Sequence, residues 1–297
     1  MRARSTVIVT AIVLSLVPLL AAPASAACPR YGPDHVGGNV HIAGINEISG
    51  VVAGRRWDVL WAEEDSGNPE RVYAVSPSGR TKANIVVRRS TNRDWEDIAY
   101  GAGKIWLGDI GSHRNVVQVY WFPEPRLSVK AVRAKHADLR YEQGGTHNAE
   151  AMFIVGTNLF VVTKERSGWM GLVYRTSIKG LTNGGSRTMS RVGRVTIGNV
   201  TGADAGARGF IVRNLSGTAE FYPWRGARSV TRALHGRPCD LTVGRGESVA
   251  FSRWNTRLYS ISEGTNPAVR YVARRGRARA GRPWFHRPAA GPPGSLD

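Results

Sequence analysis

The sequence predicts an all-β protein with the architecture of a single β-propeller, and three observations lead to that prediction. Short segments rich in β-branched and aromatic residues recur along the chain between turn residues. No window combines a helical period with helix caps. A pattern of about four strands repeats at intervals of roughly 40–55 residues, which is the period of propeller blades.

The predicted strands are short, and each is bounded by Gly, Pro, Asn, Asp or Ser. The clearest are 58–62, 71–75, 85–88, 104–107, 116–122, 158–162, 172–175, 209–212 and 257–260. Even spacing of such strands indicates a sandwich, a barrel or a propeller, and the repeat favours the propeller.

Each repeat begins with a carboxylate that precedes a short apolar strand. These carboxylates are Glu47, Glu96, Glu150, Asp204 and Glu247. Five blades can be traced in this way, and a sixth could lie within 225–239. The last blade lacks a fourth strand, which an N-terminal strand at 38–42 could supply to close the ring.

The two ends of the chain differ in composition from the middle. Residues 1–26 have a positive start, an apolar run and the small residues Ala24-Ser25-Ala26, which is the order of a secretory signal peptide. Residues 27–273 form the predicted propeller. Residues 274–297 are rich in Arg, Gly and Pro and are predicted to be a disordered basic tail. We expect a secreted, extracellular protein with no transmembrane segment after signal cleavage.

The two cysteines, Cys28 and Cys239, are expected to form a disulfide, because exported proteins meet an oxidising environment. The alternative is two unpaired thiols, one at a mobile end and one in a core.

The chain is strongly basic, with 41 Lys and Arg against 22 Asp and Glu and a formal net charge of +19. This charge predicts a weak, salt-sensitive attraction to anionic surfaces such as a cell envelope. No recognition helix, zinc finger or RNA-binding motif is present, so the charge does not indicate a nucleic-acid binder.

A set of ordered motifs resembles a family of secreted actinobacterial propeller proteins of mostly unassigned function. The motifs are W-E-D-I-A, G-D-I-G-x-x-R, P-E-P, N-A-E-A, V-V-T-K-E, V-T-G-A-D and I-S-E-G. The resemblance covers about residues 47–272, and it extends loosely to phytase-like esterase and strictosidine-synthase-like propellers. Ser112-His113 and Arg213-Asn214 depart from the family pattern, which puts in doubt any polar site that uses those positions.

The repeated carboxylates are the candidate metal ligands. In a propeller the first strand of each blade lines the central channel, so Glu47, Glu96, Glu150, Asp204 and Glu247 should converge around one end of it. Carboxylates this close need a raised pKa, a basic neighbour or a cation, and Ca²⁺ or Mg²⁺ would suit oxygen ligands. The alternative is structural, with each carboxylate accepting backbone N–H bonds from the neighbouring blade.

A second set of polar residues follows the second strands of the repeats. Lys164, Arg213 and Asp65 are candidates for ligand binding. Asp109 and the nearby His113 and His147 are candidates for a general base or a further metal ligand, although most such histidines lie on the surface.

Two functions remain open at the level of sequence. The first is a monomeric binding protein that uses the channel for an extracellular ligand or a cell-envelope component. The second is a metal-assisted hydrolase of an ester, lactone or phosphoester, in which the carboxylates hold the ion. No nucleophile motif is visible, so the sequence favours the binding protein.

Overall fold

The protein consists of mainly antiparallel strands arranged in sheets around a central axis. The computed structural model describes residues 28–166 and 168–276. The first sheet contains β2 (Ile48–Ala53), β3 (Leu60–Glu64), β4 (Arg71–Val75), β5 (Thr81–Arg88) and β9 (Ala131–Arg133). The second contains β6 (Trp95–Gly101), β7 (Lys104–Asp109), β8 (Val116–Pro123) and β10 (Lys135–Tyr141), joined to β14 (Gly185–Arg194), β13 (Leu172–Ser177), β12 (Asn158–Thr163) and β11 (Ala149–Val155).

Two smaller sheets complete the ring. One contains β15 (Val200–Ala205), β16 (Gly209–Asn214), β17 (Thr218–Pro223) and β18 (Cys239–Thr242). The other contains β19 (Ala250–Phe251), β20 (Arg257–Ile261), β21 (Ala268–Arg274) and β1 (Tyr31–Asn39). The helical elements are a 3₁₀ turn, η1 (Glu142–Gly144), and α1 (Val230–Leu234).

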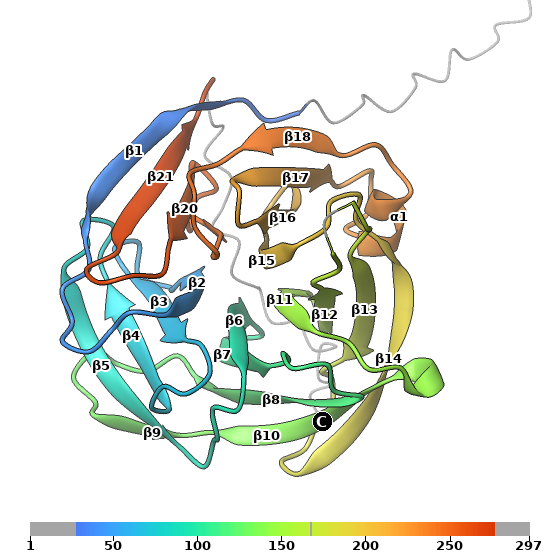
Figure 1. Ribbon diagram of the computed structural model, residues 1–297, viewed down its shortest axis with the longest axis horizontal. Coiled ribbons are helices and arrows are strands. Elements are labelled where there is room, and N and C mark those ends of the chain that lie inside the picture. The colour runs from blue at the N-terminus through green and yellow to red at the C-terminus, as the bar shows by residue number, and fades with distance from the viewer. Residues whose placement is uncertain (1–27, 167, 277–297) are drawn as a thin grey trace, which may run out of the picture.

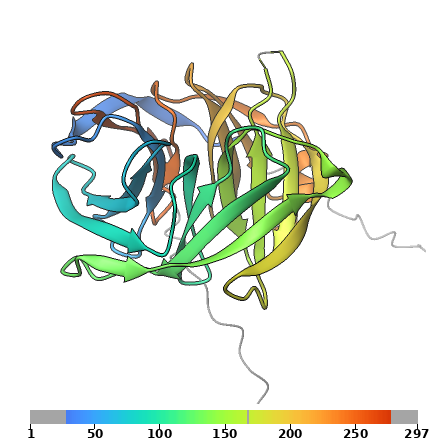
Figure 2. The ribbon, with the colours of Figure 1, turned by 60° about the horizontal axis from the view of Figure 1, so that its bottom comes forward.

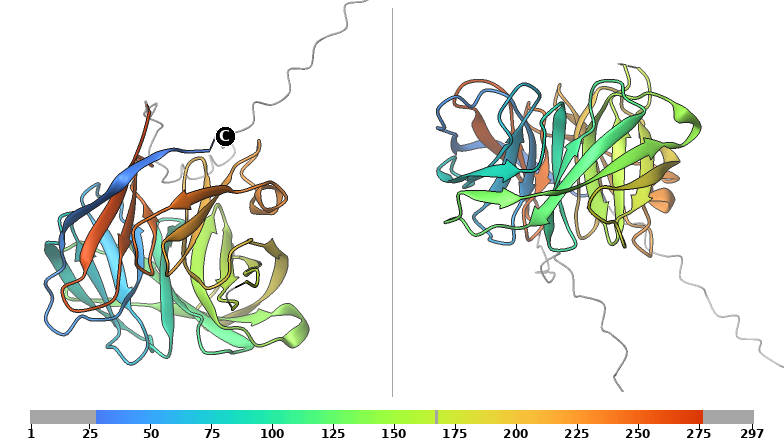
Figure 3. Two further views of the ribbon diagram at one scale, coloured as in Figure 1. Left: turned by 45° about the horizontal axis from the view of Figure 1, so that its top comes forward. Right: turned by 90° about the horizontal axis from the view of Figure 1, so that it is seen from below.

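The innermost strands surround the axis. Figure 1 shows β2, β6, β11 and β15 around the centre, with β1, β5, β10, β14 and β18 on the outside. Neighbouring inner strands contact one another all the way round, because β19 contacts both β15 and β2. Figure 2 shows the ring tilted, and Figure 3 shows it edge-on as a wide, short body. The predicted all-β propeller class is confirmed.

The strands pair into four sheets, because β10 and β14 run parallel and join two meanders into one sheet. Five blades are obtained only if that joined sheet is divided in two, so the number five stays a prediction. The segment 225–239, where the sequence allowed a sixth blade, contains α1 and the first residue of β18.

The N-terminal strand does close the last sheet, but it lies earlier than predicted. β1 pairs with β21 from Tyr31↔Arg274 to Asn39↔Ala268. The predicted segment 38–42 shares only residues 38 and 39 with β1, and Val40 after it is fully buried in the core. β21 also includes Arg274, which the sequence assigned to the tail. The predicted signal peptide and the tail beyond Gly276 lie outside the described residues.

Aromatic stacking connects neighbouring sheets in the core. Phe160, Phe153, Phe210 and Tyr222 form a column in which successive ring centroids lie 4.7–5.0 Å apart. These residues come from β12, β11, β16 and β17, so the column spans two sheets. Aromatic pairs at this spacing contribute about 0.5–1.5 kcal/mol beyond the burial of their area.

The predicted disulfide between Cys28 and Cys239 is confirmed. It ties the chain just before β1 to the first residue of β18. Neither helical element among the described residues is long and apolar enough to cross a membrane.

Candidate functional site

β-Bulges near the start of the inner strands determine where their acidic side chains point. The pairing of β6 with β7 shifts between Trp95 and Asp97, and that of β11 with β12 shifts between Ala149 and Ala151. Glu96 and Glu150 are the extra residues at these bulges. A bulge re-aims a side chain out of the regular alternation. We call the end of the ring where the inner strands begin the mouth.

Three carboxylates meet at the mouth. One oxygen from each of Asp65, Asp94 and Glu96 lies within 4.8 Å of the others. Asp65 follows the last residue of β3, Asp94 precedes β6, and Glu96 lies within β6. Glu96 is buried, whereas Asp65 and Asp94 are partly exposed, so the triad can be reached from solvent.

Neighbouring loops hold the triad in place. The Asp94 backbone N–H donates to Oδ1 of Asp109 (3.1 Å), and the Ser112 hydroxyl donates to the Asp94 carboxylate. The Asn92 amide donates to the Asp65 carbonyl oxygen (2.8 Å). A Cβ at Gly111 would overlap the carboxylate oxygens of Asp94 and Glu96, so a larger residue there would displace these side chains.

Glu63 is a fourth carboxyl beside this cluster. It lies on β3, is fully buried, and neither of its oxygens has a well-formed hydrogen bond within the described part of the chain. Burial, together with the nearby charge of Asp65, raises the pKa of Glu63 to about 8. Gly50 gives the Glu63 carboxyl its space, since a Cβ there would overlap Oε1 and approach the Ile98 nitrogen to 2.7 Å.

Lys164 lies at the mouth beside another of its carboxylates, Glu150. Its ammonium is 2.6 Å from Oε1 of Glu150, which also accepts a bond from the Asn148 amide (3.0 Å). Burial alone would lower the pKa of Lys164, but the bond with Glu150 and the charges of Glu96 and Glu247 raise it overall. Lys164 therefore stays charged and compensates part of the negative charge.

Glu247 and Glu263 form a carboxyl pair at the same rim. Burial raises the pKa of Glu247, and the charge of Glu263 and a hydrogen bond with it raise it further. Burial likewise raises the pKa of Glu96, with added repulsion from Glu150, Asp65 and Asp94. The mouth thus collects several carboxyl groups beside Lys164, and burial and mutual repulsion favour the neutral form of some of them.

A pocket of about 900 Å³ opens beside this pair. Its lining includes Asn214, Leu215, Arg245, Glu247 and Glu263. A volume of this size accommodates a small organic ligand.

Only Glu96 of the five predicted carboxylates belongs to the triad. Glu150 and Glu247 lie elsewhere at the mouth, and the other two have separate surroundings. Glu47 lies at the rim, where its Oε2 accepts a bond from the Asn68 amide (2.6 Å). Asp204 is near the other end of its strand, beside Ala53 and Tyr100, and its carboxylate accepts bonds from the Phe251 (2.7 Å) and Ala205 (2.7 Å) backbone nitrogens. The expectation that Asp204 joins the others at one end is therefore wrong, because it lies four residues inside β15.

Asp204 accepts backbone N–H bonds, which is the structural role that the sequence left open as the alternative. Asp97 has the same role and makes more such bonds. The fully buried Asp97 carboxylate accepts bonds from the backbone nitrogens of Ile98 (2.8 Å), Met152 (2.7 Å) and Ala203 (3.3 Å). Met152 lies on β11 and Ala203 on β15, so one side chain links three inner strands.

The other candidate residues have partners of their own. Asp109 is fully buried and pairs with Arg114 (2.6 Å), so it supports the Asp94 loop. His147 is 2.9 Å from the Tyr174 hydroxyl, and burial lowers the pKa of its imidazole. His113 is exposed on the neighbouring loop.

Arg213 is fully buried below the mouth. Its guanidinium donates to the Ser248 carbonyl oxygen (3.2 Å) and the Ser260 hydroxyl (2.7 Å). These bonds hold β16 against the last sheet and leave Arg213 without an exposed face for a ligand.

Sequence reasoning missed Asp94 and Glu63. Asp94 stands just before β6 and Glu96 lies at the bulge within it, so the regular alternation of a strand does not predict that they meet. Glu63 stands beside a second acid, Glu64, at the end of a buried strand, and only the structure shows that its carboxyl lies over Gly50.

No family model matches the sequence, and no curated protein matches it, so the likeness to phytase-like esterase and strictosidine-synthase-like propellers gains no support. Two solved structures are similar in fold. A glutaminyl cyclase from Myxococcus xanthus is 12% identical with a TM-score of 0.48, covering 81% of this chain and 96% of that one. A protein from Thermus thermophilus described as an oxidoreductase, glucose dehydrogenase, is 10% identical with a TM-score of 0.45, covering 81% and 99%. The chain is a β-propeller with an acidic channel mouth.

Proposed function

We propose that this protein is an extracellular binding protein whose mouth holds Ca²⁺ or Mg²⁺ between Asp65, Asp94 and Glu96. The observation that carries the proposal is the convergence of three carboxylate oxygens within 4.8 Å. Two oxygens bound to one Ca²⁺ at about 2.3–2.6 Å can be no more than about 5 Å apart, so this spacing suits a shared ion.

The surroundings support a cation at this position. Glu63 adds a buried carboxyl whose oxygens lack well-formed hydrogen bonds within the described residues, and Gly111 leaves room for the Asp94 and Glu96 oxygens. A divalent ion would offset the repulsion that raises the pKa of Glu96. The neighbouring pocket lined by Glu247 and Glu263 would hold the organic ligand.

The hydrolase remains a second candidate because of the Glu247–Glu263 pair. A carboxyl with a raised pKa beside a pocket can act as a general acid. Glu150→Gln and Glu247→Gln should then each lower the metal-dependent hydrolysis of p-nitrophenyl acetate, bis-p-nitrophenyl phosphate or an aliphatic lactone. If the metal-loaded wild type hydrolyses none of these three compounds, the hydrolase is excluded and the binding protein is the remaining proposal.

Cation binding is tested by calorimetric titration of the chelator-treated protein with CaCl₂ and MgCl₂, together with elemental analysis. Asp94→Asn should weaken binding by about tenfold or more, because it removes a charged ligand. Asp240→Asn is the matched control, since Asp240 is exposed on β18 away from the mouth. Equal affinities of the two variants, or no binding to the wild type at millimolar metal, would refute the cation site.

A glycine pair gives an independent check of the geometry. Gly111→Ala should weaken cation binding, because the new Cβ pushes two triad carboxylates apart at the flexible ends of their side chains. Gly32→Ala should have no effect, since a Cβ there meets the Ala273 carbonyl oxygen only at 3.5 Å.

A further inference from the structure

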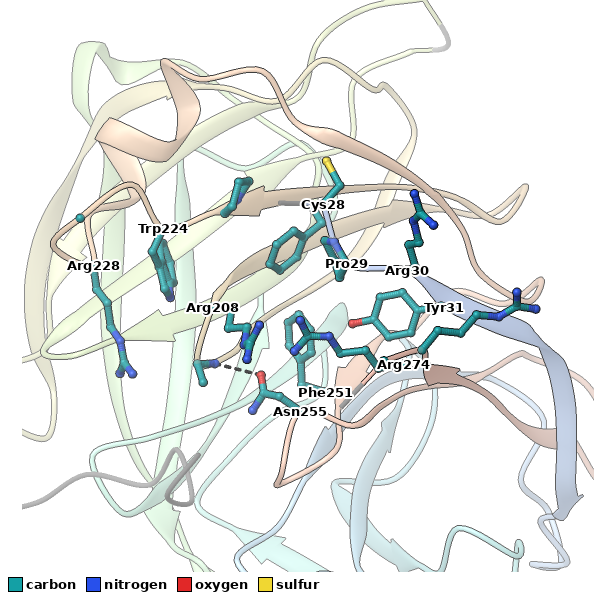
Figure 4. Close-up of a pocket in the computed structure, with 16 residues that line it drawn as sticks. Cys28, Pro29, Arg30, Tyr31, Arg208, Trp224, Arg228, Phe251, Asn255 and Arg274 are labelled. Carbon is teal, nitrogen blue, oxygen red and sulfur yellow. Dashed lines mark hydrogen bonds between the residues drawn. The ribbon is translucent and has the colours of Figure 1, made fainter. Parts of the chain in front are cut away.

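A second pocket, of about 810 Å³, lies at the opposite end of the ring from the mouth. It is bounded by the β15–β16 turn, the β19–β20 turn, the end of β17 and the two outer segments next to β1 and β21. The β15–β16 turn is far from the mouth, because Ala205 at the end of β15 pairs with Phe210 at the start of β16. Figure 4 shows this pocket with its lining side chains.

Arginines dominate the charge of this pocket, which we call the arginine pocket. Its charged lining residues are Arg30, Arg208, Arg228, Arg274 and Arg275. No Asp or Glu is among the described residues that line it. Within residues 28–166 and 168–276, neither Arg208 nor Arg274 forms a salt bridge with an acid.

Two of these guanidinium groups face the same space as a phenol. In Figure 4 the side chains of Arg208 and Arg274 extend toward the middle of the pocket beside Tyr31. Burial lowers the pKa of Arg274, and the charge of Arg208 lowers it further. Burial raises the pKa of Tyr31 to about 12 even though Arg274 and Arg208 oppose the shift, so the phenol is neutral and can donate a hydrogen bond.

An apolar wall stands beside these charges. Phe221, Trp224 and Phe251 are buried residues whose surfaces line the pocket. Arginine binds phosphate through paired N–H donors, and aromatic side chains offer flat faces for stacking. The two features together select a molecule that is anionic at one end and aromatic at the other.

We propose that the arginine pocket binds a small aromatic molecule that carries a phosphate group. The phosphate lies between Arg208, Arg274 and the Tyr31 hydroxyl. The aromatic part lies against Trp224 and Phe251. A bound dianion offsets the mutual repulsion of the two guanidinium groups, which no described acid neutralises.

The walls of the pocket are fixed before any ligand arrives. The disulfide holds the Cys28–Tyr31 segment against β18, and the Ala207 backbone nitrogen donates to the Asn255 side chain (2.9 Å) across the two turns. Preorganised walls reduce the entropy lost on binding. The site needs no residue of the mouth, so it is independent of the proposed function.

The test is fluorescence and calorimetric titration of the full chain with 1-naphthyl phosphate, 1-naphthol and inorganic phosphate. We expect 1-naphthyl phosphate to bind most tightly and to change the fluorescence of Trp224. Arg208→Gln and Arg274→Gln should each weaken its binding by about tenfold, the usual size of a lost charged hydrogen bond. Arg208→Lys should retain part of the affinity, because the charge remains but the paired donors do not.

Arg140→Gln is the matched control, since Arg140 is exposed on β10, outside the arginine pocket. An equal loss in this variant would show general attraction to a basic protein and overturn the proposal. If 1-naphthol bound as tightly as 1-naphthyl phosphate, the arginines would add no affinity and the proposal would be overturned. If inorganic phosphate bound as tightly, the aromatic wall would add none, and the proposal would be overturned as well. Absence of 1-naphthyl phosphate binding at millimolar concentration also overturns it, provided that circular dichroism shows folded protein.

Discussion

Glu63 is fully buried, and burial raises its pKa more than an interaction with the Gly50 backbone lowers it. It lies next to Asp65 and below Glu96, and its carboxyl oxygens lack well-formed hydrogen bonds. Its pKa of about 8 means that the folded protein keeps a proton that the unfolded chain releases near 4.5. Stability from this group is therefore fully present below pH 4.5 and is lost as pH rises to about 8.

Glu63→Gln should remove this pH dependence, because the neutral amide has a similar shape and does not ionise. In the presence of a chelator, the free energy of unfolding of the wild type should fall between pH 5 and pH 9 more steeply than that of the variant. Urea unfolding at several pH values measures the difference. Equal slopes for the two proteins would mean that Glu63 ionises in the folded state at little cost.

The residue scale is also where sequence-based prediction was least complete. Spacing identified Glu96 as a candidate metal ligand, but it treated Asp65 only as a separate candidate for ligand binding and did not place it beside Glu96. Spacing placed Asp204 at the wrong end. Asp204 is the fifth residue of β15, whereas Glu96 is the second residue of β6. Such offsets of a few residues depend on bulges, which leave no clear trace in composition.

At the scale of elements, Asp97 is the connection that holds the inner strands together. It joins β6 to β11 and β15 through backbone nitrogens that would otherwise be buried without partners. Asp97→Ala should lower the free energy of unfolding by about 2–4 kcal/mol, since unsatisfied buried donors cost about 1–3 kcal/mol each. Asp97→Asn keeps one acceptor oxygen and should lose less.

Denaturant unfolding of both Asp97 variants checks this order, with Asp240→Ala as an exposed control. A loss no larger than that of the control would show that water replaces the carboxylate. Burial raises the pKa of Asp97 well above its usual range, so the difference between the Asn variant and the wild type should be smallest at low pH.

Most strands could be predicted, because β-branched and aromatic residues between turn residues mark them directly. For example, the predicted segment 71–75 is β4 from end to end. β1 could not be placed in the same way, since Tyr31–Asn39 contains three glycines and a proline and depends on pairing with β21. α1 escaped detection because five residues are too few for a helical period.

At the scale of the whole molecule, the disulfide closes a loop with a sequence separation of 211 residues. In the chain-entropy model such a loop stabilises the folded state by about 5 kcal/mol. The Cys28→Ser, Cys239→Ser double variant should unfold at lower urea concentration than the oxidised wild type. Dithiothreitol should shift the wild type toward the variant and leave the variant unchanged, and an unshifted wild type would show that the bridge adds no stability.

The pairing of β1 with β21 also has a consequence for how the protein reaches its native state. β15 to β18 can assemble as soon as residues 200–242 are available, whereas the closing sheet needs partners more than two hundred positions apart. Contacts of such long range form slowly, because the chain entropy of loop closure is lost before they stabilise anything. Until β1 pairs with it, β21 has an unpaired edge that can pair with a strand from another chain. Newly made molecules should therefore be most prone to aggregate, or to exchange their first strand, in the interval before the ring closes.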